Sequence, residues 1–280
     1  MLRIAVPNKG SLSETAAEML AEAGYAGRRD SKTLHLIDVD NDVEFFFLRP
    51  RDIATYVASG ALDVGITGRD LLRDVRQPDA REIEQLGFAR STFRFAGPPG
   101  RYSSIEELHG IRVASAYPGL VDDYLRAHGV EAQLVPLDGA VESAVRLGVA
   151  DVIADVVETG TTLRQAGLEI FGPVIIESEA VLISRPGDAD GTETLLRRLR
   201  GVMVARQYVL LDYDLPADLV DQAVAISPGR ESATISPLRD AAWVAVRVMI
   251  PRRGMNRVMD ELYALGARAI LVTAIHAARL

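Results

Sequence analysis

The 280-residue chain contains no cysteine, which excludes a disulfide scaffold and any cysteine-ligated metal site. Histidine is scarce as well. His35, His109, His128 and His276 show no spacing typical of metal ligands, so we expect structural or surface roles for all four. No apolar run approaches the roughly 20 residues that a membrane helix needs, and the chain opens on a strand-like segment instead of a charged leader. We therefore expect a cytoplasmic protein without membrane contact.

The chain also lacks an excess of positive charge. Its 31 basic residues stand against 39 acidic ones, a formal charge of −8, and only residues 205–280 are nearly neutral. This distribution argues against nucleic acid as a partner. A phosphate-bearing ligand must instead be held locally by backbone amides and a few arginines, with a divalent cation neutralising part of its charge. The 48% hydrophobic and 25% charged content is that of folded domains, and the length suggests two or more.

The first part of the chain alternates strands and helices. A strand over 2–6 leads through the loop Pro7–Gly10 into a helix that opens at Ser11 and ends near Gly24. Further strands are expected over 43–48 and 62–66, with a helix over 52–58 between them. Such alternation predicts a largely parallel sheet that binds ligands at the carboxyl ends of its strands.

A break at 97–100, rich in proline and glycine, separates a second α/β segment. Strands are expected over 111–115, 132–135 and 152–157, and helices over 121–127 and 139–147. A long return strand over 174–183 and a helix over 192–208 then bring the chain back to the first segment. We therefore predict two lobes with a cleft between them, the first formed by 1–91 and 181–205 and the second by 92–180.

The pattern changes after residue 206. Strands are expected over 209–213, 234–235, 244–250 and 269–275, with one helix over 217–225 and another that has an apolar face from Met255 to Leu265 and ends at Gly266. The order βαββαβ is that of a ferredoxin-like module. Because small modules of this kind often regulate the enzyme that carries them, residues 206–280 are expected to form a regulatory domain.

The sharpest local feature is the segment Val152–Leu163, in which an apolar strand runs into a Thr-Gly-Thr-Thr loop that opens a helix. Free amides and three hydroxyls converge there, where the helix dipole favours an anion. The segment is thus a candidate phosphate cradle. From local spacing alone, an ordinary strand-to-helix turn with a threonine cap is the alternative.

This segment and several others resemble the long form of the ATP phosphoribosyltransferase family, the first enzyme of histidine biosynthesis. The resemblance rests on residues at fixed offsets from Glu142 to Leu163, and on four further segments: Pro7–Gly10, Phe47–Ile53, Leu62–Asp70 and Leu137–Glu142. One departure is Ser11, where many members carry arginine. It leaves the first loop with less positive charge, so that phosphate contacts there rest on Lys9 and on amides.

The resemblance implies two lobes like those of type II periplasmic binding proteins and a C-terminal ferredoxin-like, ACT-like domain. It implies dependence on Mg²⁺, feedback inhibition by L-histidine, and association between homodimers and hexamers. The implied substrates are ATP and phosphoribosyl pyrophosphate (PRPP), which give phosphoribosyl-ATP and pyrophosphate. Catalysis would rest on positioning two polyanions and stabilising the leaving pyrophosphate.

The loop formed by Glu158, Thr159, Gly160, Thr161 and Thr162 is assigned to the ribose 5-phosphate. Asp155 and Glu158 are expected to meet ribose hydroxyls or Mg²⁺-bound water, while the metal ligands themselves stay unassigned.

Asp138 and Glu142 can face the same phosphoribosyl group. Alternatively, they merely open the helix 139–147, where the dipole favours acidic residues.

Residues at other strand ends complete the expected active site. Lys9 and Arg49 follow first-lobe strands and can reach anionic oxygens, with surface ion pairs as the alternative. Tyr117 can stack on the adenine, or it can serve as a hydrophobic plug beside a proline. Gly68, together with Gly65, Thr67 and Asp70, can line the cleft, although simple turn chemistry explains the glycines equally well.

In the C-terminal module, the family resemblance places Asp214, Thr234 and Ala269 around bound histidine. Asp214 would meet the ammonium group and Thr234 a polar end of the ligand, in a pocket between paired modules. The alternative is that Asp214 caps a helix starting near Pro216.

Three other functions compete with the enzyme. A non-catalytic sensor of the same two-lobed fold would be expected to carry an export signal or a helix-turn-helix, and neither is evident. A nucleotide-dependent oxidoreductase is weaker still, because no Gly-x-Gly-x-x-Gly follows the first strand. A purely amino-acid-binding regulatory protein would leave the Thr-Gly-Thr-Thr loop without a purpose.

Overall fold

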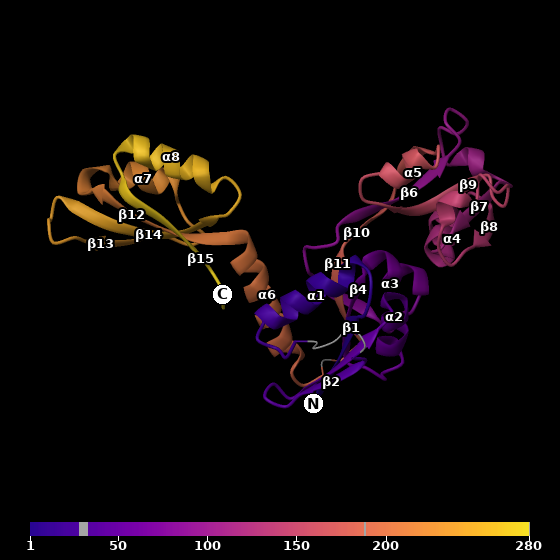
Figure 1. The fold of residues 1–280 in the computed structure, drawn as a ribbon, viewed down its shortest axis with the longest axis horizontal. Helices are drawn as coiled ribbons and strands as arrows, with labels where there is room; N and C mark the ends of the chain where they lie inside the picture. Colours follow the sequence, from indigo (N-terminus) through magenta and orange to yellow (C-terminus); the bar gives the residue numbers. More distant parts are fainter. Residues whose placement is uncertain (28–32, 188, 280) are drawn as a thin grey trace. The chain divides into compact units, whose positions relative to one another are not determined.

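The computed structural model describes residues 1–27, 33–187 and 189–279. Its strands form three separate sheets, and the chain divides into two compact units (Figure 1). The first unit comprises residues 1–21 and 25–193, and the second comprises 22–24 and 194–280. The boundary between the units thus falls at the start of the helix α6 (Thr192–Gln207), whereas the predicted boundary at 205/206 falls near its end.

The first sheet has six strands in the order β2-β3-β1-β4-β11-β5. Their bounds are β1 Leu2–Pro7, β2 His35–Asp38, β3 Val43–Leu48, β4 Val64–Gly68, β5 Arg81–Gln85 and β11 Ala180–Ser184. The core strands β3, β1 and β4 run parallel, as the alternating pattern predicts. The central strands β4 and β11 are buried at every residue, because both faces of the sheet are covered. We call this sheet and its helices the first lobe.

The helices of the first lobe are α1 (Ser11–Glu22), α2 (Pro50–Ala58) and α3 (Arg69–Val75). Helix α2 packs its buried side chains Ile53, Ala54 and Val57 against the sheet. Gly65 explains how closely: a Cβ at this position would overlap the Ile53 side chain. Neither Gly65 nor Gly68 has a positive φ, so the backbone conformation requires glycine at neither position; a Cβ at Gly68 would overlap the Asp70 carboxylate.

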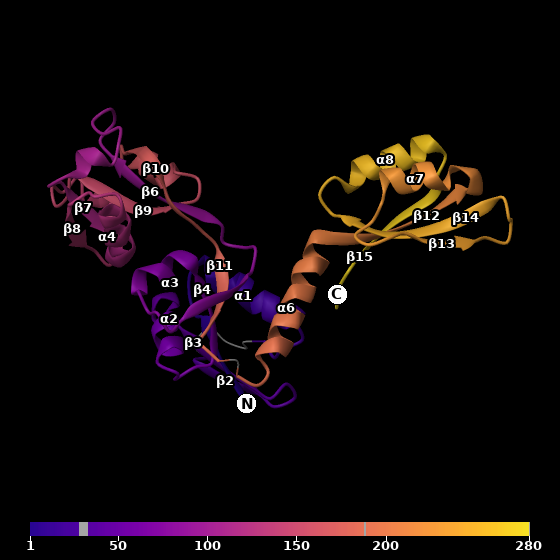
Figure 2. The same cartoon turned by 180° about the vertical axis from the view of Figure 1, so that it is seen from behind.

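The second sheet has five strands in the order β10-β6-β9-β7-β8 (Figure 2). Their bounds are β6 Ser91–Gly97, β7 Arg112–Ser115, β8 Gln133–Pro136, β9 Val152–Val157 and β10 Glu169–Ser178. The associated helices are η1 (Glu106–Leu108), α4 (Pro118–Ala127), η2 (Val141–Ser143) and α5 (Thr161–Gln165). Phe93 and Phe95 of β6 are fully buried beneath α4 and centre the core of this second lobe.

Two predictions for the second lobe are wrong. The helix expected over 139–147 is absent: the positive φ of Gly139 and Ala140 keeps these two residues out of a helix, and residues 141–148 form only the short η2 and a following turn. The return strand expected over 174–183 is divided at Glu179: β10 pairs with β6 in the second sheet, while β11 enters the first sheet between β4 and β5.

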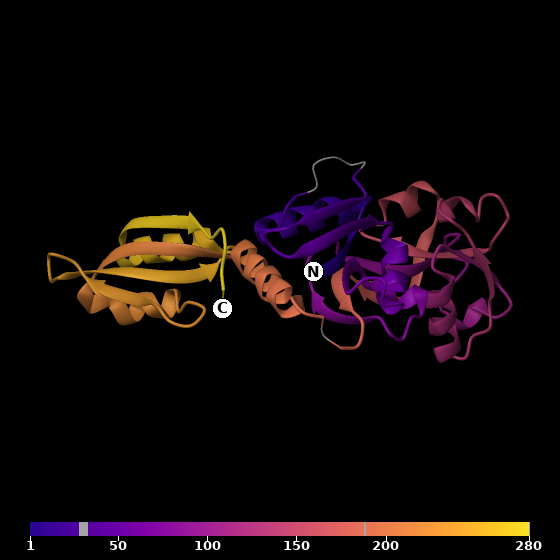
Figure 3. The same ribbon diagram turned by 90° about the horizontal axis from the view of Figure 1, so that it is seen from below.

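The third sheet forms the C-terminal module in the order β13-β14-β12-β15. Its elements are β12 Tyr208–Pro216, η3 Ala217–Leu219, α7 Val220–Ile226, β13 Thr234–Pro237, β14 Trp243–Pro251, α8 Met255–Leu265 and β15 Arg268–Ala274. This confirms the predicted βαββαβ order. Alternate residues of β12 are buried under α7 and α8, and the other face of the sheet carries no helix of this module (Figure 3). No helix in the described residues is long and apolar enough to cross a membrane.

Candidate active site

The loop after β9 turns at Gly160 into the short helix α5. Gly160 adopts φ +69° and serves as the N-cap of α5, a backbone conformation that other residues rarely adopt. Glu158, Thr159, Thr161 and Thr162 are exposed around it. The Thr159 and Thr161 hydroxyl oxygens lie 3.1 Å apart, and Arg164 donates to Thr161. The chain therefore turns at Gly160, and exposed threonines flank the start of α5.

A pocket of about 270 Å³ adjoins this loop and contains most of the predicted phosphoribosyl residues. Its lining residues are Glu142, Asp155, Val156, Val157, Glu158, Thr159, Gly160, Thr162 and Leu163. Thr161 and Asp138 do not line it, and Asp138 is exposed in the loop before η2. Because Glu142 lies in η2 and faces the pocket, the alternative in which it merely opens a long helix is wrong.

Asp155 is the chemically distinctive group in this pocket. Burial raises the pKa of its carboxyl to about 6, and the nearby charges of Glu142 and Asp70 act in the same direction. The Val156 amide donates to Asp155 Oδ1 at 2.8 Å and partly opposes the shift. Asp70 belongs to the first lobe, and burial likewise raises the pKa of its carboxyl. A carboxyl of the first lobe thus lies close enough to influence the ionisation of Asp155 in the second.

This acidic group does not by itself form a metal cage. Among residues 1–27, 33–187 and 189–279, no three His, Cys, Asp or Glu side chains gather as metal ligands. Mg²⁺ usually keeps several waters and binds through one or two carboxylates plus substrate phosphates. Asp155 and Glu158 fit this mode of binding, in which the ion arrives together with the substrate phosphates and the protein adds one or two carboxylates.

A second pocket of about 360 Å³ shares Val157 and Glu158 with the first and was not predicted. Its lining adds two arginines, with the full set being Arg69, Arg90, Ser91, Thr92, Val157, Glu158, Glu177, Ser178 and Glu179. Arg69 is held by two hydrogen bonds to Glu82, of 2.8 and 2.9 Å. Residues that line this pocket come from both lobes and are far apart in the chain, so no local motif could reveal them.

Tyr117 lies between the acidic group and the hydrophobic core. Its ring meets Phe93 edge-on at 5.1 Å, and the Arg51 guanidinium lies 5.0 Å from the ring centre. Burial raises the pKa of its hydroxyl, and the charges of Asp70 and Asp155 raise it further. The side chain therefore packs as a plug would, and the Asp70 and Asp155 charges are near enough to act on its hydroxyl.

Lys9, Arg49 and Gly68 leave the same edge of the first sheet. They follow or end β1, β3 and β4, whose parallel pairing aligns Pro7 with Leu48. Lys9 and Arg49 are exposed, and within the described part of the chain neither forms an ion pair. The alternative that they serve in surface ion pairs therefore has no support among the described residues. Gly68 is buried at the start of α3. None of the three lines either pocket.

The proposed effector residues lie on different strands of the C-terminal module. Asp214 is inside β12, so the alternative in which it caps a helix near Pro216 is wrong. Ala269 has φ +49° in β15, where the register with β12 shifts between Asp212 and Asp214. Thr234 starts the edge strand β13, which β14 separates from β12. Asp214 and Ala269 are thus neighbours, and Thr234 is not in their immediate row.

Comparison with known proteins supports one family along the whole chain. The family model described as ATP phosphoribosyltransferase matches residues 49–201, and the model described as the HisG C-terminal domain matches 205–277. The ATP phosphoribosyltransferases of Paenarthrobacter aurescens and Streptomyces coelicolor are 64% and 61% identical, each over the full length of both chains. A chain of the ATP phosphoribosyl transferase (HisG:HisZ) complex from Thermotoga maritima shares 28% identity with a TM-score of 0.64.

The match to that solved structure covers 72% of this chain and 98% of the Thermotoga maritima chain. The matches extend through both lobes and the C-terminal module. The relatives belong to the same family that the motifs around the Thr-Gly-Thr-Thr loop resemble. The chain belongs to the ATP phosphoribosyltransferase family, as a long-form pentosyltransferase.

Proposed function

We propose that this enzyme joins ATP to PRPP and forms phosphoribosyl-ATP and pyrophosphate, the first step of histidine biosynthesis in the cytoplasm. The observation that carries the proposal is the pocket beside Gly160, in which helix-start amides, threonine hydroxyls and the Asp155 carboxyl converge. Residues 1–91 with 181–205 and residues 92–180 would be the catalytic lobes, and 206–280 the regulatory domain.

In this proposal, the loop Glu158–Thr162 holds the ribose 5-phosphate through amides and hydroxyls, and Asp155 accepts a ribose hydroxyl. The lone pair of adenine N1 attacks the anomeric carbon, while the bond from that carbon to pyrophosphate breaks and its electrons leave with the pyrophosphate. Neutral N1 needs no strong base. Lys9 and Arg49 would meet anionic oxygens from the first lobe.

Asp138, Glu142 and Gly68 are kept as substrate-binding candidates, of which Glu142 has the best support because it lines the pocket. Tyr117 would contact the adenine beside the carboxyl group of Asp155. Mg²⁺, when bound with PRPP, supplies positive charge to the pyrophosphate, and Asp155 and Glu158 are its nearest candidate partners through water.

The direct test is the formation of phosphoribosyl-ATP from ATP, PRPP and Mg²⁺, with pyrophosphatase present, with and without L-histidine. We expect product, and less of it when histidine is added. Folded protein that forms no product would contradict the proposed reaction and favour a binding or sensor role. Product that is insensitive to histidine would keep the reaction and leave the C-terminal module with a role in assembly.

Thr162→Ala should weaken PRPP binding roughly tenfold or more, because it removes a hydroxyl that donates to a charged phosphate. ATP binding should change by less than about twofold, since ATP is assigned to other residues. Michaelis constants for both substrates measure the difference. Thr55→Ala, at an exposed position of α2, is the matched control. Equal losses for the two substrates would remove the loop from its assigned role.

The raised pKa of Asp155 predicts a pH dependence of PRPP binding. With a pKa of about 6 in place of its ordinary 3.8, the carboxyl is mostly protonated below pH 6 and becomes a charged, stronger acceptor above it. With Mg²⁺ present to neutralise the ligand phosphates, affinity for PRPP should therefore increase from about pH 5 to about pH 7, as titration calorimetry can measure. The ligand phosphate also ionises near pH 6. The Asp155→Asn variant keeps that ligand titration but lacks the carboxyl, so the difference between the two proteins gives the contribution of Asp155 to the pH dependence. Identical pH profiles for the two proteins would show that Asp155 does not titrate in binding.

L-histidine is proposed to bind at Asp214, Thr234 and Ala269, between modules of two subunits, and to favour a compact hexamer over dimers. Asp214→Ala should raise the half-inhibitory histidine concentration roughly tenfold, because the ligand ammonium loses its partner. Inhibition is measured relative to each variant's own turnover without histidine. Asp218→Ala, exposed in η3, is the matched control. Unchanged inhibition of the Asp214 variant would move the effector pocket elsewhere.

A further inference from the structure

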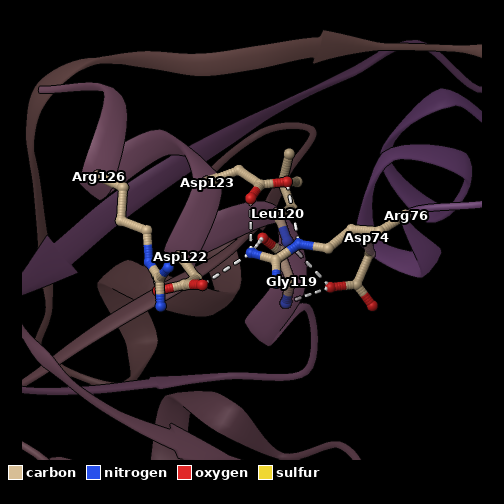
Figure 4. Close-up of polar contacts among 7 residues, drawn as sticks. All are labelled: Asp74, Arg76, Gly119, Leu120, Asp122, Asp123 and Arg126. Carbon is tan, nitrogen blue, oxygen red and sulfur yellow. Dashed lines mark hydrogen bonds and ion pairs between the residues drawn. The ribbon is translucent and has the colours of Figure 1, made fainter.

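The two lobes meet where α3 of the first lobe reaches the start of α4 of the second. The Gly119 and Leu120 amides of α4 both donate to Asp74 Oδ1 of α3, at 2.8 and 3.1 Å (Figure 4). These amides belong to the first turn of α4, which cannot pair them within the helix. The N-cap residue of α4, Tyr117, makes no side-chain cap in the described structure. A carboxylate from the opposite lobe thus performs the capping role.

The second oxygen of the same carboxylate holds Arg51. Arg51 Nη1 lies 2.7 Å from Asp74 Oδ2, while Nη2 of Arg51 donates to the Ala116 carbonyl oxygen. The guanidinium also lies over the Tyr117 ring. Asp74 is therefore connected to the residue before Tyr117 and to its ring through Arg51, and to the residues after Tyr117 through the amides of α4.

Asp74 differs from the charges around it in burial. Only 4% of its side chain is exposed. Arg76 adds bonds to the Gly119 carbonyl oxygen and to the carboxylates of Asp122 and Asp123, but its side chain is 42% exposed. Exposed ion pairs of this kind contribute little, whereas a buried carboxylate that accepts several hydrogen bonds is costly to remove. The inner contact at Asp74 is thus the decisive one.

Gly119 gives independent support, because it shows that the two backbones touch. A Cβ at position 119 would overlap the main-chain carbonyl oxygen of Asp74. The φ of Gly119 is not positive, so its helical conformation does not itself require glycine. In an isolated helix, alanine at this position would be more stabilising than glycine. The requirement for glycine here comes from the opposite lobe.

We infer that Asp74 is a positioning residue: through Arg51 and the start of α4, it sets the place of Tyr117 and the spacing of the two lobes on that side of the site. The part that concerns ATP rests on the proposed function, because Tyr117 is assigned there to the adenine. The part that concerns lobe spacing does not depend on the reaction.

The kinetic test uses Asp74→Asn, which keeps the size of the side chain and removes its charge, and Asp74→Ala. We expect the Michaelis constant for ATP to rise roughly tenfold or more and that for PRPP to rise by less than about threefold, because Tyr117 loses its supports. Asp79→Ala, at an exposed position after α3, is the matched control and should behave like the native enzyme. An unchanged constant for ATP, or equal rises for both substrates, would overturn the assignment to Tyr117.

The structural test needs no activity, and the cysteine-free chain suits it. Asp40→Cys in the first lobe and Gln133→Cys in the second are both exposed and can carry a pair of spin labels. Labelled protein is diluted with unlabelled protein so that the distance within one chain is measured. We expect Asp74→Asn and Gly119→Ala each to broaden or shift the distribution of distances between the lobes, with circular dichroism showing that both variants remain folded.

Distributions that match the native one in both variants would overturn the positioning role, even in an enzyme that is fully active. Conversely, a changed distribution in a protein without detectable phosphoribosyl transfer would retain the lobe contact and reject only the proposed reaction.

Discussion

The site depends on the double crossing of the chain between the first two sheets. The segment after β5 and the junction of β10 with β11 run side by side, and the amides of Leu86 and Ala180 bond to the carbonyl oxygens of Ala180 and Phe88. At the same crossing, the Ser178 hydroxyl accepts from the Asp70 amide at 3.1 Å, and the Glu179 carbonyl accepts from the Arg69 amide. The crossing thereby fixes the start of α3, and with it the buried Asp70, whose charge acts on Asp155 of the other lobe.

An acidic centre is an unexpected environment for two polyanionic substrates. Burial raises the cost of ionising Asp155, and the charges of Glu142 and Asp70 add to it. Such a group repels a bare phosphate, but it accommodates ribose hydroxyls and phosphates that carry a divalent cation. The phosphate itself is then left to the neutral donors of the Gly160 loop. Division of labour between neutral phosphate donors and acidic hydroxyl acceptors fits a chain whose net charge is −8.

Hydrophobic periodicity predicted the elements that bury whole runs or clear alternations, such as β3, β9 and α8. It missed β2, β5 and β6; of these, β5 (Arg81–Gln85) is mostly polar and lies at a sheet edge. It also predicted a helix after Leu137, where apolar residues recur at helical spacing, since periodicity does not report the positive φ of Gly139 and Ala140. Local pattern describes which faces are buried, and backbone turns can override it.

The candidate site likewise contains residues that the local sequence could indicate and residues that only the fold brings together. The Gly160 loop is contiguous, so sequence could indicate it, and Asp155 lies five residues before it. Asp70 and Asp74 gain their roles from residues far away in the chain, such as Ser178 and Gly119. Nothing in the local sequence of α3 shows that its last turn will cap a helix of another lobe. Only the pairing of sheets and helices brings these groups together.

The C-terminal module extends this argument to the proposed effector residues. Strands in a sheet are spaced by about 4.8 Å, so the two steps from β12 across β14 to β13 measure roughly 10 Å. The register aligns Asp214 with Ala245 and Ser236, whereas Thr234 is aligned with Arg247 and lies two residues away from that row. A sheet face without a covering helix does not by itself enclose an amino acid, because small-molecule sites are concave. For Asp214 and Thr234 to act on one ligand, a second surface has to close over it, and this is the physical reason to place the effector pocket between two modules.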